Sequence, residues 1–271
     1  MEPEPVVKAG RSSLDQHTDR SSAYPPEAFE FLESWEERHF WFLERNRIIG
    51  DWMVRHIPDL RRKAILEVGC GNGTVLAHLR RMGLQVMGVD VFQTALIRCR
   101  RRTGAPVSQA DASHLPFREH VKVVGLFDCL EHFDRPEQVI QEVYRCLQPG
   151  GFLLVTVPAV PSLYGWIDRL SGHRLRYDRR GLVALLQNGG FELRRISYFM
   201  TAVFPALILS RLFSEWRFRN TPDAYKPLAE QFQISPGSNA LLGTLCALDR
   251  AAMRIMNLPI GGSLIALAHK I

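Results

Sequence analysis

The feature that most limits the possible folds of this chain is a glycine-rich turn between a short apolar run and a helical pattern. Residues 64–68 read Ala-Ile-Leu-Glu-Val, an apolar run too short for an independent helix. Three glycines spaced by two follow, Gly69, Gly71 and Gly73, and apolar side chains then recur at helical spacing in residues 75–79. The stretch therefore predicts a strand, a tight turn and a helix. Glycine suits such a turn because it tolerates unusual backbone angles and lets a ligand approach the bare backbone.

The residues around this turn limit the kinds of ligand that it can bind. The helix that follows presents unpaired N–H groups and a positive dipole end, which favours a carboxylate, a phosphate or a polar sugar. The dinucleotide fingerprint G-x-G-x-x-G does not fit, because it would need glycine at Thr74 or Leu76. Instead the pattern is E-x-G-x-G-x-G, which begins at Glu67. The glycine spacing therefore disfavours a nicotinamide dehydrogenase.

A second strand-like run, residues 85–90, ends in Asp90, which lies 21 residues after Gly69. That offset suits a carboxylate that accepts hydrogen bonds from the ribose hydroxyls of an adenosine. The alternative is that Asp90 only caps the helix expected from about residue 93.

With these elements in this order, the chain resembles the class I methyltransferases that use S-adenosylmethionine (SAM). The resemblance implies an α/β fold with a doubly wound, Rossmann-like sheet of seven strands, the last of which, residues 263–270, inserts antiparallel between the fifth and sixth. It also implies that Asp111 lies at the adenine edge and that Phe127, after a fourth strand at 120–126, borders the methyl group. The cofactor contacts expected for SAM are Glu67, Gly69, Gly71, Gly73, Asp90, Val91, Asp111, Ala112, Phe127 and Arg45.

The N-terminal pattern H-[FW]-W-F-x-x-R-x-R-x-I starts at His39 and resembles the first segment of a bacterial branch of these enzymes. Such a helix would lie over the SAM pocket, and Arg45 would reach the methionine carboxylate. Ordinary packing of Phe40, Trp41 and Ile48 onto the sheet is the alternative. The expected organisation is a disordered tail (1–26), a helical cap (27–58), a SAM-binding core (59–200), an apolar insertion between strands six and seven (201–262) and a final core strand (263–271).

Composition excludes several classes of function. The chain has 34 basic and 28 acidic residues, which gives a net charge of +6, and only five of the basic residues are lysine. An arginine excess suits anionic acceptors or acidic lipid headgroups. No basic run is interleaved with stacking aromatics, so nucleic acid is not expected as a partner. The five cysteines are scattered without a C-x-x-C pair, which argues against a bound metal and for a reducing, cytoplasmic compartment.

The insertion is unusual because residues 196–210 lack charge and are followed by arginines alternating with Phe213, Trp216 and Phe218. The apolar stretch is too short for a bilayer span, which needs about 20 residues. Three interpretations stay open: an interfacial helix that touches the inner face of the membrane through 201–219, a lid over an apolar acceptor pocket, and a subdomain with its own small core.

Two histidines are candidates for the base that an acceptor hydroxyl requires. His132 follows the fourth strand and His173 lies in a polar loop after the fifth strand, where open α/β sheets bind ligands. The pattern D-x-x-x-G-H-x-x-R-Y around His173 also resembles that of the bacterial branch. We expect His173 to act as base or acceptor contact with Asp168 orienting it, although a purely structural network is the alternative. The expected catalytic residues are His173, Asp168 and His132, and the expected substrate contacts are Arg176, Tyr177 and Trp166.

The resulting prediction is a SAM-dependent methyltransferase acting on an oxygen of an apolar or amphiphilic small molecule or of a lipid-linked acceptor. A catalytically silent SAM-binding partner of a membrane-associated assembly is the alternative.

Overall fold

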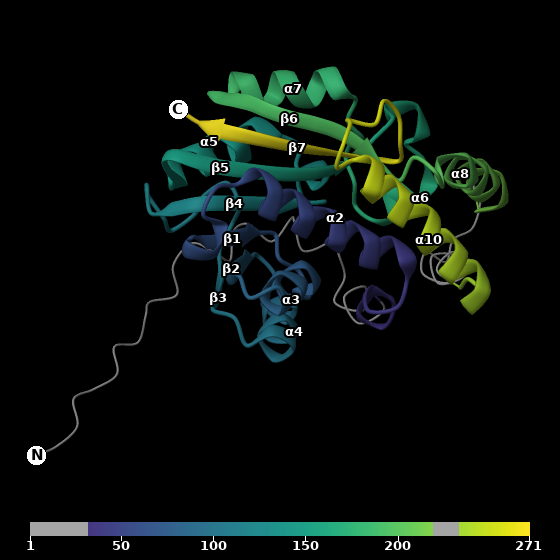
Figure 1. The fold of residues 1–271 in the computed structure, drawn as a ribbon, viewed down its shortest axis with the longest axis horizontal. Helices are drawn as coiled ribbons and strands as arrows, with labels where there is room; N and C mark the ends of the chain where they lie inside the picture. The colour runs from purple at the N-terminus through teal and green to yellow at the C-terminus, as the bar shows by residue number, and fades with distance from the viewer. Residues whose placement is uncertain (1–31, 219–232) are drawn as a thin grey trace, which may run out of the picture.

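The computed structural model describes residues 32–218 and 233–271, and within them the chain forms a seven-stranded sheet (Figure 1). The strand order is β3-β2-β1-β4-β5-β7-β6, and β7 runs antiparallel to both of its neighbours whereas the other pairs are parallel. This arrangement confirms the doubly wound fold and the insertion of the last strand between the fifth and sixth. The strands are β1 (Ala64–Val68), β2 (Gln85–Asp90), β3 (Val107–Gln109), β4 (Val121–Phe127), β5 (Leu147–Pro158), β6 (Phe191–Phe199) and β7 (Ser263–Lys270).

Helices cover both faces of the sheet because successive side chains of its central strands point to opposite sides. Ile65 and Val123 enter one apolar core, and the adjacent Leu66 and Val124 enter the other. One face is covered by α2, α3, α4 and α10, and the other by α5 and α7 (Figure 1). The helices are α2 (Phe40–His56), α3 (Thr74–Arg81), α4 (Gln93–Thr103), α5 (Pro136–Cys146), α6 (Trp166–Leu170), α7 (Arg179–Asn188), α8 (Phe204–Phe218) and α10 (Pro236–Ala252), with short 3-10 turns η3 (Leu60–Arg62), η4 (Leu130–His132) and η5 (Pro161–Leu163).

Two strand boundaries differ from the sequence prediction. The fourth strand is shifted by one residue, since Phe127 still pairs with Thr156 and is its last residue. The fifth strand starts at Leu147, five residues before the continuous apolar run that begins at Phe152, because Leu147 pairs with Val121 before the Gln-Pro-Gly-Gly turn interrupts the register. Neither change moves the carboxyl ends of the strands away from the loops that follow them.

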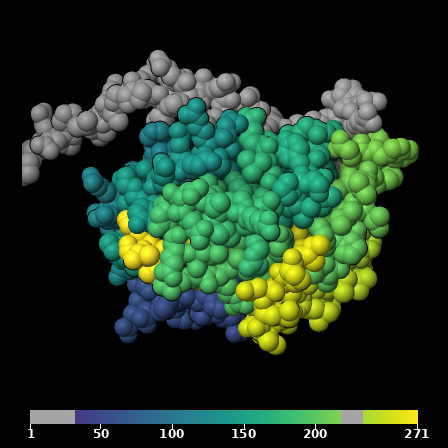
Figure 2. Space-filling view, turned by 90° about the horizontal axis from the view of Figure 1, so that it is seen from above, coloured from purple at the N-terminus to yellow at the C-terminus, as the bar shows by residue number. Residues whose placement is uncertain are grey.

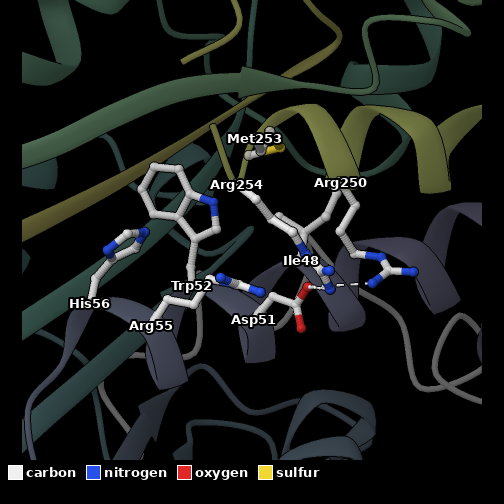
Figure 3. Close-up of a pocket in the computed structure, with 8 residues that line it drawn as sticks. All are labelled: Ile48, Asp51, Trp52, Arg55, His56, Arg250, Met253 and Arg254. Atoms are coloured by element: carbon white, nitrogen blue, oxygen red, sulfur yellow. Dashed lines mark hydrogen bonds and ion pairs between the residues drawn. The ribbon is translucent and has the colours of Figure 1, made fainter. Parts of the chain in front are cut away.

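The N-terminal helix α2 and the insertion helix α10 lie side by side, although about 200 residues separate them in sequence (Figure 3). Asp51 of α2 accepts hydrogen bonds from Arg250 at 3.3 Å and from Arg254, just beyond α10, at 3.1 Å. The space at this seam is about 10 Å³, room for about one water molecule. This space is therefore a small gap in the packing between the two helices and cannot hold a substrate.

The insertion gathers at one end of the molecule, the end toward which the parallel strands run (Figures 1 and 2). Its helices α8 and α10 flank residues 219–232, which lie outside the described part of the chain, as does the predicted tail 1–26. None of the helices within the described ranges is long and apolar enough to cross a bilayer.

Candidate active site

A cavity of about 660 Å³ lies at the carboxyl ends of the parallel strands. Its floor includes the ends of β1, β2, β4 and β5, at Val68, Asp90, Phe127 and Pro158. Side chains of α2 and α8 complete its walls, so the N-terminal helix and the insertion both enclose the site. Loops after the carboxyl ends of strands are the usual ligand site of open α/β sheets.

The glycine turn after β1 forms one end of the cavity. Gly69 and Gly71 have φ angles of +76° and +50°, the left-handed region that glycine adopts without strain. A methyl group added at Gly69 would lie 2.5 Å from the Cys129 sulfur, whereas one at Gly71 would meet no atom within 4 Å. Gly71 therefore turns bare backbone toward open space in the cavity. Gly73 is the N-cap of α3 and does not line the cavity.

Asp90 fastens this turn to the end of β2. Its carboxylate accepts the Gly71 N–H at 2.8 Å and the Phe92 N–H at 2.9 Å. The side chain is buried but lines the cavity, and burial raises the pKa of its carboxyl. Asp90 thus serves the start of α4 and still faces the ligand space, so the two predicted roles coexist.

Glu67, at the end of β1, also lines the cavity and is 3% exposed. Its Oε2 atom has no hydrogen-bond partner among the described residues. Burial raises the pKa of this carboxyl well above the usual value. An acceptor left without a partner in a buried site favours a ligand that brings hydrogen-bond donors or positive charge.

Arg45 reaches the cavity from α2, as its predicted place over the pocket requires. Its guanidinium donates to Asp128 Oδ2 at 2.7 Å and lies 4.9 Å from the ring centre of Trp41. Sequence reasoning missed Asp128, which directly follows β4. The contact of Arg45 with a methionine carboxylate stays a prediction, since in this structure its Nη1 is bound to Asp128.

The residues predicted for the adenine edge (Asp111) and for the methyl group (Phe127), and the other predicted cofactor contacts Val91 and Ala112, also lie at the cavity. Asp111 accepts hydrogen bonds from the Ser113 N–H at 2.8 Å and hydroxyl at 2.6 Å, so a local turn fixes its carboxylate.

Asp168 is the centre of a buried polar network at the other end of the site. It is fully buried and accepts hydrogen bonds at 3.0 Å from His173 Nδ1, Arg176 Nε and Arg211 Nη1. Burial alone would raise the pKa of Asp168, but these partners hold it well below its ordinary value. Asp168 does not line the cavity, so it acts on a ligand only through the groups that it positions.

His173 presents its second ring nitrogen to the cavity. Because Nδ1 donates to Asp168, the lone pair is on Nε2, which lies 4.0 Å from Glu131 Oε1. The His132 ring stands edge-on to that of His173, with ring centres 4.9 Å apart. Burial lowers the pKa of His132 to about 3, so this imidazole is neutral at ordinary pH. The two predicted histidines are therefore brought together.

Glu131, between the two histidine rings and the strand end, was missed as a site residue. It is fully buried, lines the cavity and receives no hydrogen bond on either carboxylate oxygen from the other described residues. Burial and the nearby Asp128 raise the pKa of its carboxyl well above the usual range. The signal that could have found it is its place in Leu-Glu-His, directly beside a candidate histidine after a strand.

The predicted substrate contacts need correction. Tyr177 is buried and donates its hydroxyl to the Leu130 carbonyl at 3.3 Å, and Trp166 starts α6 with its N–H bound to Glu215, so neither lines the cavity. Arg176 does line the cavity, but its guanidinium is held by Asp168 and the Ala159 carbonyl. Tyr177 and Trp166 therefore stabilise the loop away from the cavity, whereas contact of Arg176 with an acceptor stays a prediction.

The sheet order, the glycine turn and the acid after β2 together define the class I methyltransferase fold. Residues 66–155 match the family described as a methyltransferase domain, so this part of the chain is a methyltransferase domain, and the fold around it is that of the class I SAM-dependent methyltransferases. SAM is the cofactor of this class. The open backbone at Gly71, the carboxylate of Asp90 and the unpartnered Glu67 oxygen fit its ribose hydroxyls and cationic end.

Similarity to individual proteins is partial. The malonyl-[acyl-carrier protein] O-methyltransferase of Enterobacter lignolyticus is 30% identical over 122 residues, 44% of this chain and 49% of that protein. The phthiotriol/phenolphthiotriol dimycocerosates methyltransferase 1 of Mycobacterium ulcerans is 33% identical over 128 residues, 44% of this chain and 46% of that protein. The chain thus spans about half the length of these two relatives.

Among solved structures, a Haemonchus contortus phosphoethanolamine N-methyltransferase 2 in complex with SAM superposes with a TM-score of 0.60. The match is 19% identical in sequence and covers 96% of this chain and 60% of that chain. At this identity the likeness concerns the fold.

Proposed function

We propose that this protein transfers the methyl group of SAM to an oxygen of an apolar or amphiphilic acceptor, either a small molecule or a lipid-linked one. The proposal depends on one observation: the glycine turn, the Glu131–His173 cluster and a set of apolar side chains all line the same cavity. Its apolar lining beyond the histidines is Leu163, Ile167, Leu170, Val203, Phe204, Leu207, Ile234 and Leu242.

The polar cluster supplies what an acceptor hydroxyl needs. When bound, SAM provides a methyl group on a sulfonium, which leaves as a neutral thioether when the C–S bond breaks and the new O–CH₃ bond forms. His173 lines the cavity with Nδ1 held by Asp168, and its Nε2 accepts the proton of the acceptor hydroxyl as the O–CH₃ bond forms. Asp168 holds the imidazole in the required tautomer, and the enclosing helices α2 and α8 exclude water.

The names of the relatives support this choice of acceptor. One is called an O-methyltransferase of malonyl-[acyl-carrier protein], and the other is named for phthiotriol and phenolphthiotriol dimycocerosates. An oxygen acceptor attached to a larger carrier or chain matches a site whose far wall is apolar.

The proposal includes contact of α8 with the inner face of the membrane from the cytoplasm. One side of α8 lines the cavity through Phe204, Leu207 and Arg211. The other side exposes apolar side chains at helical spacing, with Arg217 beside them, and these are Leu209, Leu212, Phe213 and Trp216. An exposed apolar helix face with a tryptophan and a cation suits the interface of an anionic bilayer. An acyl chain could then pass from the bilayer to the apolar wall of the cavity.

Transfer of labelled methyl groups tests the proposal. The full chain is incubated with methyl-labelled SAM and a total lipid and metabolite extract of the producing cells, and the labelled product is identified. We expect label in an amphiphilic compound and its loss in His173→Gln, with turnover unchanged in His120→Gln, an exposed histidine directly before β4. Binding of SAM without label in any product would instead favour the silent SAM-binding partner, whose function would survive His173→Ala and Asp168→Ala.

A further inference from the structure

We propose that Glu131, His132 and His173 bind a divalent metal cation. Each of the three residues offers one ligand atom, and these atoms all lie within 4.8 Å of one another. All three residues line the main cavity, so an ion among them would have open space on one side. The scattered cysteines indicate no metal, whereas the three ligands proposed here come from two separate loops, so their proximity is not visible in the sequence.

The hydrogen bonds of the two histidines prepare both rings for a metal. His173 Nδ1 donates to Asp168 Oδ1 at 3.0 Å, and His132 Nδ1 lies 3.3 Å from the Gly172 carbonyl oxygen, which can only accept. Each ring therefore carries its proton on Nδ1 and leaves the lone pair on Nε2. Metal-binding histidines are held in this way, with the far N–H on a carboxylate or a backbone carbonyl.

The environment of Glu131 favours binding of a cation at this place. Two carboxyl groups of this region are fully buried, Asp168 and Glu131. Asp168 receives three charged or ring N–H donors, whereas neither oxygen of Glu131 has a partner among the other described residues. A buried carboxylate is stable only when it is neutralised or paired, and a cation between it and the two rings would do so.

The donor set indicates the kind of ion. Two imidazole nitrogens and one carboxylate oxygen suit a transition ion such as Zn²⁺, Co²⁺, Mn²⁺ or Fe²⁺ better than Mg²⁺ or Ca²⁺, which prefer oxygen ligands. Bonds of about 2.1 Å would place the ligand atoms about 3.4 Å apart, so the side chains close in on the ion. The remaining coordination position would face the cavity.

Binding of the cation does not depend on the proposed function, but its use does. If the ion were bound, Nε2 of His173 would be a ligand, and the ion would lower the pKa of the acceptor hydroxyl so that its proton could pass to water instead of to that nitrogen. In both cases the three residues promote loss of the proton from the acceptor hydroxyl, either directly through His173 or through the ion.

Metal binding can be measured without any methyl acceptor. The untagged full chain is dialysed against a chelator and titrated with Co²⁺, with visible absorption and metal analysis as readouts. We expect one Co²⁺ per chain, displaced by Zn²⁺. Glu131→Gln should abolish stoichiometric binding, while His120→Gln, which changes an exposed histidine outside the cavity, should bind as the wild type does.

Two further measurements keep the test decisive. Circular dichroism and urea unfolding show whether Glu131→Gln is folded, independently of any ligand. Asp168→Asn should weaken Co²⁺ binding by about 10- to 100-fold, the effect of a changed partner behind a ligand. No stoichiometric Co²⁺ binding by the wild type, or equal binding by a folded Glu131→Gln variant, would overturn the proposal.

Discussion

Arg211 of α8 donates to Asp168 Oδ2 at 3.0 Å, and the two residues lie 43 positions apart in sequence. Asp168 in turn accepts the Nδ1 proton of His173. The ion pair therefore joins the insertion between β6 and β7 to the polar network around His173, and the position of α8 bears directly on the orientation of that ring.

Loss of this ion pair should weaken both stability and turnover. In Arg211→Ala the buried carboxylate of Asp168 loses one of its charged donors, and we expect the free energy of unfolding to fall by about 1–3 kcal/mol. Turnover should fall while SAM affinity stays unchanged, because Asp168 does not line the cavity and acts on a ligand only through the groups that it positions. Arg169→Ala is the matched control, since Arg169 pairs with Glu215 at an exposed site and should change stability by less than about 1 kcal/mol. Urea unfolding of both variants gives the comparison, and equal losses would contradict the role of Arg211.

A buried histidine at the start of α2 should make stability depend on pH. Burial lowers the pKa of His39 to about 4, whereas an unfolded histidine titrates near 6.5. Between these values the unfolded chain binds more protons, so this contribution is complete above about pH 6.5 and is lost as the pH falls toward 4. His39→Asn, which keeps a side-chain acceptor at the N-cap, should reduce the loss of unfolding free energy between pH 7 and pH 5 by about 1–2 kcal/mol. Urea unfolding at the two pH values measures it, and identical slopes would refute the assignment.

The exposed face of α8 should carry membrane binding. Trp216 is 77% exposed and Leu212 is 59% exposed. In a Leu212→Ser, Trp216→Ser double variant, binding to vesicles of mixed anionic and neutral phospholipid should fall at least tenfold, because each apolar side chain that would be buried contributes about 1.5 kcal/mol or more. Ile97→Ser removes a similarly exposed apolar side chain on α4 and should leave binding unchanged. Co-sedimentation with vesicles decides, and a double variant that binds like the wild type would exclude α8 as the contact.

The parts of the fold that the sequence predicted are those encoded locally. The run from β1 through the glycine turn to α3, and the acid that ends β2, are legible because each depends on neighbouring residues. The same holds for the order of the strands, which follows from the resemblance once these elements are placed. Asp168 as the partner of His173 was predicted for a similar reason, since only five positions separate them.

The contacts that the sequence did not predict join distant segments. Arg45 and Asp128 are 83 positions apart, and Glu131 meets His173 only because the loops after β4 and β5 end side by side. Conversely, Tyr177 and Trp166 belong to a polar, aromatic loop whose composition suggests substrate contacts. In the structure the Tyr177 hydroxyl bonds to the Leu130 carbonyl, and Trp166 is the first residue of α6. The direction of a side chain within such a loop is decided by tertiary contacts, which composition does not carry.

The central claim is that the turn at Gly71 and the carboxylate of Asp90 hold SAM at one end of the cavity. Calorimetric titration of the full chain with SAM tests it most directly, with Asp90→Asn as the variant and Asp134→Asn, an exposed acid at the opposite end of the same cavity, as the control. The account predicts one site per chain, an affinity at least tenfold weaker in Asp90→Asn, and no change in the control. No binding of SAM by the wild type, or equal affinity in all three proteins, would contradict it.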